Sequence, residues 1–212
     1  MSESALARRR LVEYLRANSG QGIISELALQ AIGAVARELF VPPRYAELAY
    51  ADEALQLAPG ATISAPSMVA VMVTAMEPAP RVRVLEIGSG SGYAAAVFAA
   101  AGMEVTGVEI VGDLLPGARD AIDRCGFGDR VTLVAGNGMN GWPLGAPYDR
   151  VVASAAIAAV PPAWLEQAAP AGVVLYPESR GGEWDVLVRL RRHAGSWERE
   201  EVQPCKFVPM RL

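Results

Sequence analysis

The sequence predicts an α/β fold, a doubly wound parallel sheet with an N-terminal helical cap and a C-terminal antiparallel hairpin. Segments of strand and helix character alternate from residue 82 to residue 176, as in a parallel sheet with right-handed crossovers. The first strand of this series runs into a turn that has glycine at every second position. Two later strand-like segments, 184–190 and 197–203, are joined through Ala194-Gly195-Ser196, as in a hairpin.

The first sixty residues are predicted to form a helical segment of the same domain. Apolar residues at helical spacing predict a helix over 5–17, a turn follows, and Ser25 is a candidate N-cap for a second helix. The expected elements are a helix at 5–17, a turn at 18–22, a helix at 25–36, a mixed segment at 45–57, a loop from 59 to 66 and an apolar helix at 67–76. We therefore expect one domain over 1–212, with 1–60 as its helical segment and 61–212 as its core and C-terminal strands.

The core elements follow from runs of strand composition that alternate with longer helical patterns. The expected strands are 82–87, 104–109, 131–135, 149–153 and 172–176, and the expected helices are 91–101, 113–125 and 161–168.

Composition favours an ordinary globular chain. The 212 residues are 52% hydrophobic and carry a net charge of −4, which gives no overall attraction to nucleic acid. An apolar leader and a run of eighteen apolar residues are both absent, so we expect neither secretion nor membrane spanning, and a cytoplasmic location. Cys125 and Cys205 are expected to be free thiols.

The glycine turn predicts a cradle for a cofactor. Glycine lets a ligand approach the backbone, and the helix that follows presents free N–H groups. Glu86 lies at the end of the preceding strand, and Gly88, Gly90 and Gly92 follow it. The next strand ends at Glu109, about 17 residues after Gly92, where a carboxylate would meet a pair of ribose hydroxyls.

Two cofactors compete for this cradle. Gly90-Ser91-Gly92-Tyr93-Ala94-Ala95 formally fits the dinucleotide pattern G-x-G-x-x-[GA], which is a weak signal alone. Glu86 would repel a pyrophosphate by several kcal/mol, whereas it would attract the cationic groups of S-adenosylmethionine. The spacing E-x-G-x-G-x-G is also the common first motif of methyltransferases, so S-adenosylmethionine is favoured. A residue that merely caps the turn is the structural alternative for Glu86.

Beyond this motif, the chain resembles the protein-L-isoaspartate O-methyltransferase family along nearly its full length. The matching blocks are Gly22-Ile23-Ile24, Arg37-Glu38-Leu39-Phe40-Val41-Pro42, Ala61-Thr62-Ile63-Ser64-Ala65-Pro66, Leu85 to Tyr93, Gly136-Asn137-Gly138, Gly141-Trp142, Ala146-Pro147-Tyr148-Asp149, Val160-Pro161-Pro162, Leu165-Glu166-Gln167 and Phe207-Val208-Pro209-Met210. The Thr-Ile-Ser block together with Phe-Val-Pro is the most specific part. The resemblance implies a Rossmann-like methyltransferase fold, with S-adenosyl-L-methionine as cofactor and no metal.

The family's activity would be methyl transfer to the carboxylate of L-isoaspartyl residues in damaged proteins or peptides. The ester then collapses to a succinimide, which repairs the site. By resemblance, Ser64 would contact the acceptor carboxylate as the catalytic residue and Thr62 would support its loop. Capping of the helix near Ser67 is the alternative for both hydroxyls. The acceptor is already ionised at pH 7, so the single histidine, His193, is expected to be a solvated turn residue.

The resemblance also implies the remaining site residues. The cofactor would be bound by Ala61, Glu86, Gly88, Ser89, Gly90, Glu109, Ile110, Asn137 and Gly138. The acceptor peptide would be bound by Ile63, Ala155, Phe207, Val208 and Pro209. A core position is the alternative for Ile110, and an ordinary edge segment is the alternative for 207–209. Trp142 and Trp164 are expected to serve packing.

The chain departs from the family pattern at four places, of which the first three bear on specificity and the last is a loop detail. Asn137 stands where most members carry Asp, Ala158-Ala159 replaces a pair that usually begins with proline, Glu178-Ser179 follows Pro177 in place of Val-Gly, and Ala171 replaces a glycine. They keep open a dedicated enzyme that modifies one peptide or natural product. A non-catalytic cofactor-binding module and an RNA methyltransferase are less favoured. We expect a peptide or protein partner, no nucleic acid, no membrane and a monomer.

Overall fold

The computed structural model describes residues 2–20 and 23–211. The helices are α1 (Glu3–Asn18), α2 (Glu26–Ala34), α3 (Pro66–Ala75), α4 (Tyr93–Ala100), α5 (Leu115–Arg124) and α6 (Pro162–Gln167). The strands are β1 (Leu55–Ala58), β2 (Ala61–Ile63), β3 (Arg83–Ile87), β4 (Glu104–Glu109), β5 (Val131–Ala135), β6 (Tyr148–Ala153), β7 (Ala168–Glu178), β8 (Asp185–His193) and β9 (Ser196–Cys205). Short 3-10 turns lie between them, including Arg37–Leu39 (η1), Pro43–Leu48 (η2) and Gly138–Asn140 (η5). The predicted turn at 18–22 and the block Gly22-Ile23-Ile24 reach residues 21 and 22, which lie outside the described residues.

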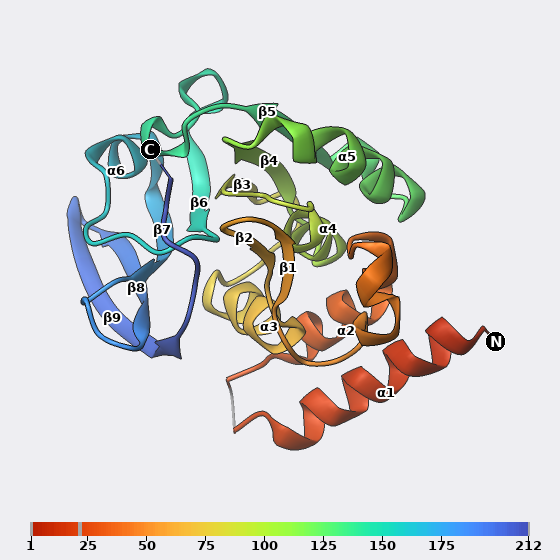
Figure 1. Ribbon diagram of the computed structural model, residues 1–212. Coiled ribbons are helices and arrows are strands. Elements are labelled where there is room, and N and C mark those ends of the chain that lie inside the picture. The colour runs from red at the N-terminus through yellow and green to blue at the C-terminus, as the bar shows by residue number, and fades with distance from the viewer. Residues whose placement is uncertain (1, 21–22, 212) are drawn as a thin grey trace.

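The central sheet has the strand order β5-β4-β3-β6-β7-β8-β9 (Figure 1). Strands β3 to β7 pair in parallel, and β8 and β9 continue the sheet antiparallel. The predicted doubly wound sheet and C-terminal hairpin are therefore confirmed. From β3 the chain builds outward through β4 and β5, and then returns to place β6 on the other side of β3. Ligands bind at such a switch point, beyond the carboxyl ends of the strands.

Two apolar clusters hold helices to opposite faces of the sheet. On β3, Val84 packs in the cluster formed with α1 to α5, whereas Leu85 and Ile87 pack in the cluster that includes Trp164 of α6. This alternation follows from the two-residue period of a strand. It turns Glu86, like Val84, toward the side of helices α1 to α5, and the hairpin strand β2 lies beside the end of β3 where the acid is found (Figure 1).

The predicted loop at 59–66 contains a small hairpin that the sequence analysis missed. Leu55 pairs with Ile63 and Gln56 with Thr62, in an antiparallel two-stranded sheet. Gly60 makes the turn with a φ of 69°, a conformation that glycine adopts without strain. Because β1 and β2 have only four and three residues, their alternation was too short to predict a pair of strands.

The C-terminal hairpin turns at Ala194 and Gly195, whose φ angles are 48° and 84°. Positive φ at both residues suits the twist of the flanking strands. His193 lies at this exposed end, as predicted. Within the described residues, no helix is both long enough and apolar enough to cross a membrane.

Candidate active site

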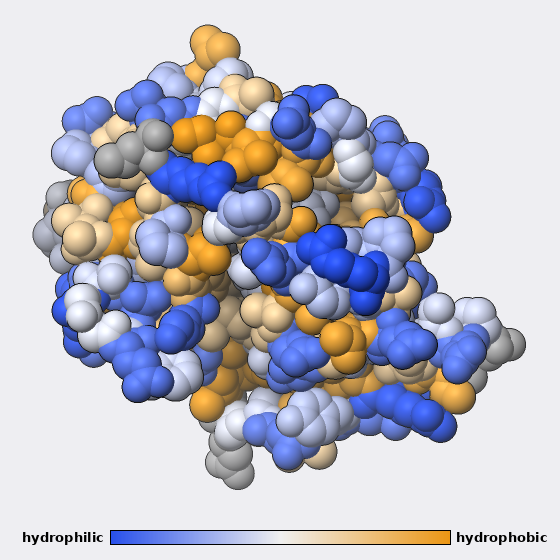
Figure 2. All heavy atoms as spheres, viewed as in Figure 1, coloured by the Kyte–Doolittle hydropathy of each residue, from blue (hydrophilic) through white to orange (hydrophobic). Residues whose placement is uncertain are grey.

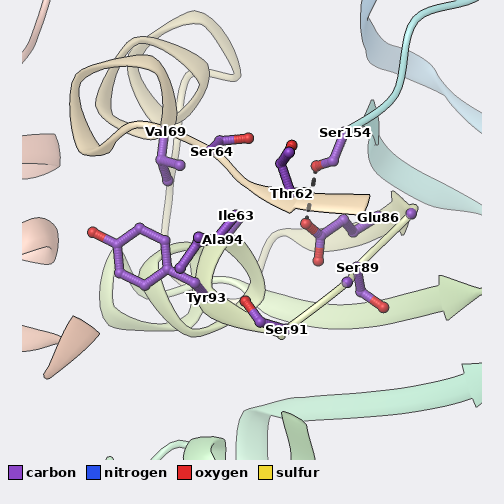
Figure 3. Close-up of a pocket in the computed structure, with 12 residues that line it drawn as sticks. Thr62, Ile63, Ser64, Val69, Glu86, Ser89, Ser91, Tyr93, Ala94 and Ser154 are labelled. Carbon is purple, nitrogen blue, oxygen red and sulfur yellow. Dashed lines mark hydrogen bonds between the residues drawn. The ribbon is translucent and has the colours of Figure 1, made fainter. Parts of the chain in front are cut away.

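A small, partly open cavity lies where the carboxyl ends of β3 and β6 meet the hairpin strand β2. Its walls come from β2 and the start of α3, from the glycine turn with the start of α4, and from the end of β6. The lining residues are Thr62, Ile63, Ser64, Val69, Glu86, Gly88, Ser89, Gly90, Ser91, Tyr93, Ala94 and Ser154. Figure 3 shows Thr62 drawn beside the pair formed by Glu86 and Ser154, whose hydrogen bond is dashed. The predicted hydroxyl pair and the predicted acid therefore share one cavity.

The glycine turn needs its glycines for backbone reasons. Gly88, Gly90 and Gly92 have φ angles of 80°, 53° and 82°, all in the region that side chains disfavour. A Cβ on Gly92 would also lie 2.8 Å from the Ile122 side chain. Three of the five residues 88–92 thus have left-handed backbone conformations, which explains why glycine stands at every second position.

Glu109 closes this turn. Its Oε2 accepts the backbone N–H of Gly90 at 2.7 Å, and its Oε1 accepts that of Val111 at 2.8 Å. Each oxygen retains a second lone pair, so the carboxylate can still accept ribose hydroxyls. The Gly90 amide already donates to the Glu109 side chain, so it is not available to a pyrophosphate. This agrees with the preference for S-adenosylmethionine over a dinucleotide.

Glu86 is the least satisfied group of the cavity. It is fully buried; its Oε1 accepts the Ser154 hydroxyl at 3.2 Å, and its Oε2 has no partner among the described residues. Burial raises the pKa of Glu86 to about 8, the Ser154 hydrogen bond lowers it, and the neighbouring Glu109 raises it. A buried carboxylate with a free oxygen in a cavity fits a cationic ligand, because the ligand would supply the missing charge and donor. The capping alternative for Glu86 is wrong, since it accepts no backbone amide here.

Ser64 and Thr62 do not cap the helix that follows them. The N-cap of α3 is Ala65, without a side-chain bond, and Asp52 Oδ1 instead accepts the N–H of Ser67 at 2.8 Å. Ser64 is half-buried in the cavity wall and Thr62 is exposed. The capping alternative for these two hydroxyls is therefore wrong.

This arrangement makes a prediction about stability. We expect Asp52→Ala to lower the free energy of unfolding by about 1 kcal/mol, because it removes the helix cap. We expect Ser64→Ala to change it by less than about 0.5 kcal/mol. Urea denaturation of both variants measures the difference, and a larger loss in Ser64→Ala than in Asp52→Ala would contradict the assignment.

The residues expected around an adenine lie at the ends of β4 and β5. Ile110 is 41% exposed directly after Glu109, so it is not a core residue and is free to pack against a ring. Asn137 Oδ1 accepts the N–H of Met139 at 3.0 Å, which commits one of the two lone pairs that we expected it to offer to adenine. Gly138 cannot carry a side chain, because a Cβ would lie 2.3 Å from Ile87.

Trp164 supports the turn at Asn137-Gly138. It is fully buried, and its Nε1 donates to the Gly138 carbonyl at 2.8 Å. Trp142 is half-buried against the same apolar cluster. The packing roles expected of both tryptophans are confirmed.

The residues expected to bind an acceptor peptide are divided between two places. Ile63 is 3% exposed and Ala155 is 7% exposed; Ile63 lines the cavity, and Ala155 lies beside Gly88. The segment 207–209 pairs with its own chain: Val208 O accepts from the Ala156 amide at 2.8 Å, and Ala156 O accepts from the Met210 amide at 2.8 Å. One edge of this segment is therefore used, and the opposite edge carries the carbonyls of Phe207 and Pro209.

A groove of about 930 Å³ joins these parts. It is lined by Tyr45, Leu48, Glu53, Ala54, Leu55, Gln56, Gly60, Ala61, Thr62 and Val208. Thr62 belongs to both the groove and the cavity, so the groove leads to the cavity wall. Apolar and strongly hydrophilic residues are mixed over the face of Figure 2, on which the hairpin lies. The groove itself is lined mainly by apolar residues, and Glu53, Gln56 and Thr62 are its polar side chains.

Three polar contacts around the site were not predicted from the sequence, and neither were the lining residues Val69, Ser91, Tyr93 and Ala94. Ser154 binds Glu86, Asp52 caps α3, and Arg37 donates to the Ser64 carbonyl at 3.1 Å. A signal existed for Ser154, because it is the polar residue directly after the predicted strand at 149–153. Arg37 and Asp52 act through backbone groups that are distant in sequence, and no local pattern marks such contacts.

Comparison with known proteins agrees with this geometry. The family model described as protein-L-isoaspartate(D-aspartate) O-methyltransferase matches residues 7–211. A protein-L-isoaspartate O-methyltransferase 2 from Anaeromyxobacter sp. (strain Fw109-5) is 41% identical over 96% of this chain and 83% of its own. A protein-L-isoaspartate O-methyltransferase from Methylorubrum populi is 39% identical over 99% and 96%.

Solved structures give the same fold. A protein-L-isoaspartate O-methyltransferase superposes with a TM-score of 0.83 at 25% identity, covering 95% of this chain and 65% of its own. A putative member from Plasmodium falciparum, in complex with S-adenosyl-L-homocysteine, has a TM-score of 0.81 at 22% identity, covering 96% and 98%. The chain belongs to the protein-L-isoaspartate(D-aspartate) O-methyltransferase family.

Proposed function

We propose that this protein methylates the free carboxylate of L-isoaspartyl residues in damaged proteins or peptides, with S-adenosyl-L-methionine as the methyl donor. The observation that carries the proposal is the cavity in which the unpartnered carboxylate oxygen of Glu86 shares its walls with Thr62 and Ser64. The relatives that bear this activity in their names cover nearly the whole chain.

The buried acid of the cavity favours a cationic cofactor. Bound S-adenosylmethionine supplies a methyl group on a positively charged sulfur. Glu86 would hold its cationic end, the glycine turn from Gly88 to Gly90 would pass beside it, and Glu109 would accept the ribose hydroxyls. Ile110 and the turn at Asn137-Gly138 would hold the adenine, and Ala61 would border the site from the hairpin. A cation bound beside Glu86 would favour the ionised form of this buried acid and pair with it.

The acceptor side needs orientation more than proton transfer. An acceptor carboxylate with an ordinary pKa near 4 is ionised at pH 7, so a general base is unnecessary. Its oxygen forms the new bond to the methyl carbon, and the electron pair of the broken bond leaves with sulfur. The Ser64 hydroxyl would donate one hydrogen bond that aims the carboxylate, and such alignment is worth about 7–11 kcal/mol in favourable cases.

A general repair enzyme is supported over a dedicated one. The groove beside the cavity is open, and Phe207 to Pro209 would lie along the acceptor backbone. The Phe207 amide donates to Asp185 and Pro209 has no amide, so an extended peptide would pair there through the carbonyls of Phe207 and Pro209. Of the departures that motivated a dedicated enzyme, Glu178 is bound by Arg180 and Arg199, and so is already paired within the sheet. Ala158 and Ala159 are exposed and small, which leaves the border of the site permissive.

The test is transfer of a labelled methyl group to an isoaspartyl peptide, with the normal aspartyl isomer as the control. We expect labelling of the isoaspartyl peptide only. Ser64→Ala is expected to lower kcat/KM by about 10- to 100-fold, because a hydrogen bond to a charged group is lost. Ser67→Ala is the matched control, since Ser67 uses its amide and not its hydroxyl in the described hydrogen bond. Equal labelling of both isomers, or full activity in Ser64→Ala, would contradict the proposal.

A further inference from the structure

Arg37 is a buried cation that lies between the helical cap and the site. It is 1% exposed and begins the 3-10 turn η1. Its guanidinium lies over the ring of Tyr93, with 5.4 Å from Cζ to the ring centroid. Among the described residues it forms no ion pair, so backbone carbonyls and the Tyr93 ring compensate its charge. Burying a charge without an ion pair costs free energy, so the position of Arg37 calls for a role beyond packing.

The hydrogen bonds of Arg37 join two walls of the site. Nη2 donates to the carbonyl of Glu53 at 2.9 Å and to that of Ser64 at 3.1 Å. Glu53 lines the open groove and Ser64 lines the cavity. One nitrogen atom therefore connects the place proposed for the acceptor chain with the place proposed for methyl transfer.

Its second nitrogen fixes the segment that leads into the groove. Nη1 donates to the carbonyls of Ala49 and Ala51 at 2.9 and 3.2 Å. In the same segment, Asp52 caps α3, the helix that begins two residues after Ser64. The segment 49–53 and the Ser64 loop are thus held together at the guanidinium and at the helix cap.

From this geometry we propose that Arg37 is a positioning residue for the acceptor. Its guanidinium sets the spacing between the groove wall at Glu53 and the hydroxyl-bearing loop at Ser64. None of these hydrogen bonds reaches the cofactor cradle at the ends of β3 and β4, and Arg37 meets that side through the ring of Tyr93, a cationic contact that a lysine can keep. The inference rests on the proposed function, and it predicts that loss of Arg37 affects the acceptor and the rate but not the cofactor.

Arg37→Lys tests this with little change in charge. A lysine ammonium has one nitrogen and cannot reach four carbonyls as a planar fork does. We expect the KM for an isoaspartyl peptide to rise about tenfold. We expect kcat to fall by up to about 100-fold, because small displacements of a reacting group have effects of that size. The Kd of S-adenosylhomocysteine, measured by calorimetry, is expected to stay within about twofold.

Arg150→Lys is the matched control. Arg150 also donates to three backbone carbonyls, those of Met76, Glu77 and Asp149, but it lies on β6 away from the cavity. We expect this variant to lose stability without a change in kcat or in the KM for the peptide. Should both variants lose only stability, Arg37 is structural and the proposal is wrong.

A second variant covers the case in which Arg37→Lys fails to fold. Arg37→Ala leaves room for a guanidinium ion, and millimolar guanidinium is expected to restore activity in it but not in Arg150→Ala. Absence of rescue, or equal weakening of cofactor binding, would overturn the proposal. A wild-type protein that does not label the isoaspartyl peptide would overturn the proposed function and this inference with it, whereas an active wild type with an unaffected Arg37→Lys overturns this inference alone.

Discussion

Replacing Glu86 by glutamine is expected to weaken the binding of S-adenosylmethionine by about 100-fold or more. Glutamine keeps the shape of the side chain and its contact with Ser154, but it removes the charge that faces the cavity. Removing one partner of a buried charge pair costs about 2–5 kcal/mol in binding. Calorimetric titration of the variant measures the loss. Glu104→Gln, at the exposed amino end of β4, is the control and is expected to bind normally.

The same substitution is expected to stabilise the protein without cofactor. The folded state holds the proton of Glu86 up to about pH 8, whereas the unfolded chain loses it near 4.5. The contribution of this carboxyl to stability is therefore full below pH 4.5, declines as the pH rises, and is lost by about pH 8. At pH 7 the penalty is about 3 kcal/mol, and Glu86→Gln removes it.

The pH dependence of cofactor affinity is the second readout of this prediction. A protonated Glu86 cannot pair with a cation, so the affinity for S-adenosylmethionine is expected to rise with pH and to level off above about pH 8. The slope below that point is at most about tenfold per pH unit. Glu86→Gln should remove the slope. A wild-type affinity that is flat between pH 6 and pH 9, or a variant less stable than the wild type, would show that Glu86 does not serve the cation.

The sheet and its ligand edge could be predicted because each depends on local pattern. Apolar strands such as 82–87, alternating with helical runs, specify a parallel sheet, and the glycines at 88, 90 and 92 specify a tight backbone turn. Glu86 and Glu109 follow from their positions at strand ends. The hairpin β1–β2 was missed because it pairs only a few residues.

The parts that the sequence did not predict depend on contacts between distant segments. Arg37 binds a carbonyl 27 positions away, and Ser154 meets Glu86 across 68 positions. The residues around Ser64 alone could not decide the role of its hydroxyl either, because serine before a helix is a common N-cap. In the structure, Asp52 from a segment of mixed composition caps the helix. Physical reasoning on one segment cannot choose between two roles when a distant side chain competes for one of them.

The second large effect is expected at Trp164, which supports the turn at Asn137-Gly138. Trp164→Ala is expected to lower the free energy of unfolding by about 3–5 kcal/mol, because a fully buried aromatic side chain is removed. Trp184→Ala is the control: Trp184 is 58% exposed, and its loss is expected to cost less than about 0.5 kcal/mol. Urea denaturation compares the two variants, and equal losses would contradict the assignment.

Trp164→Phe separates packing from hydrogen bonding at the same place. Phenylalanine retains most of the buried ring but cannot donate to the Gly138 carbonyl, which is then left unpaired at a cost of about 1–3 kcal/mol. Since Gly138 lies directly against Ile87, the turn cannot relax inward and is expected to shift at its exposed side, where Asn137 lies. We therefore expect Trp164→Phe to weaken S-adenosylhomocysteine binding by about tenfold. In the folded variant with saturating cofactor, the KM for the peptide should remain unchanged, because Thr62 lies in β2 and Ser64 in the loop before α3, both away from this turn. A raised peptide KM with normal cofactor binding would show that this turn serves the acceptor and not the adenine.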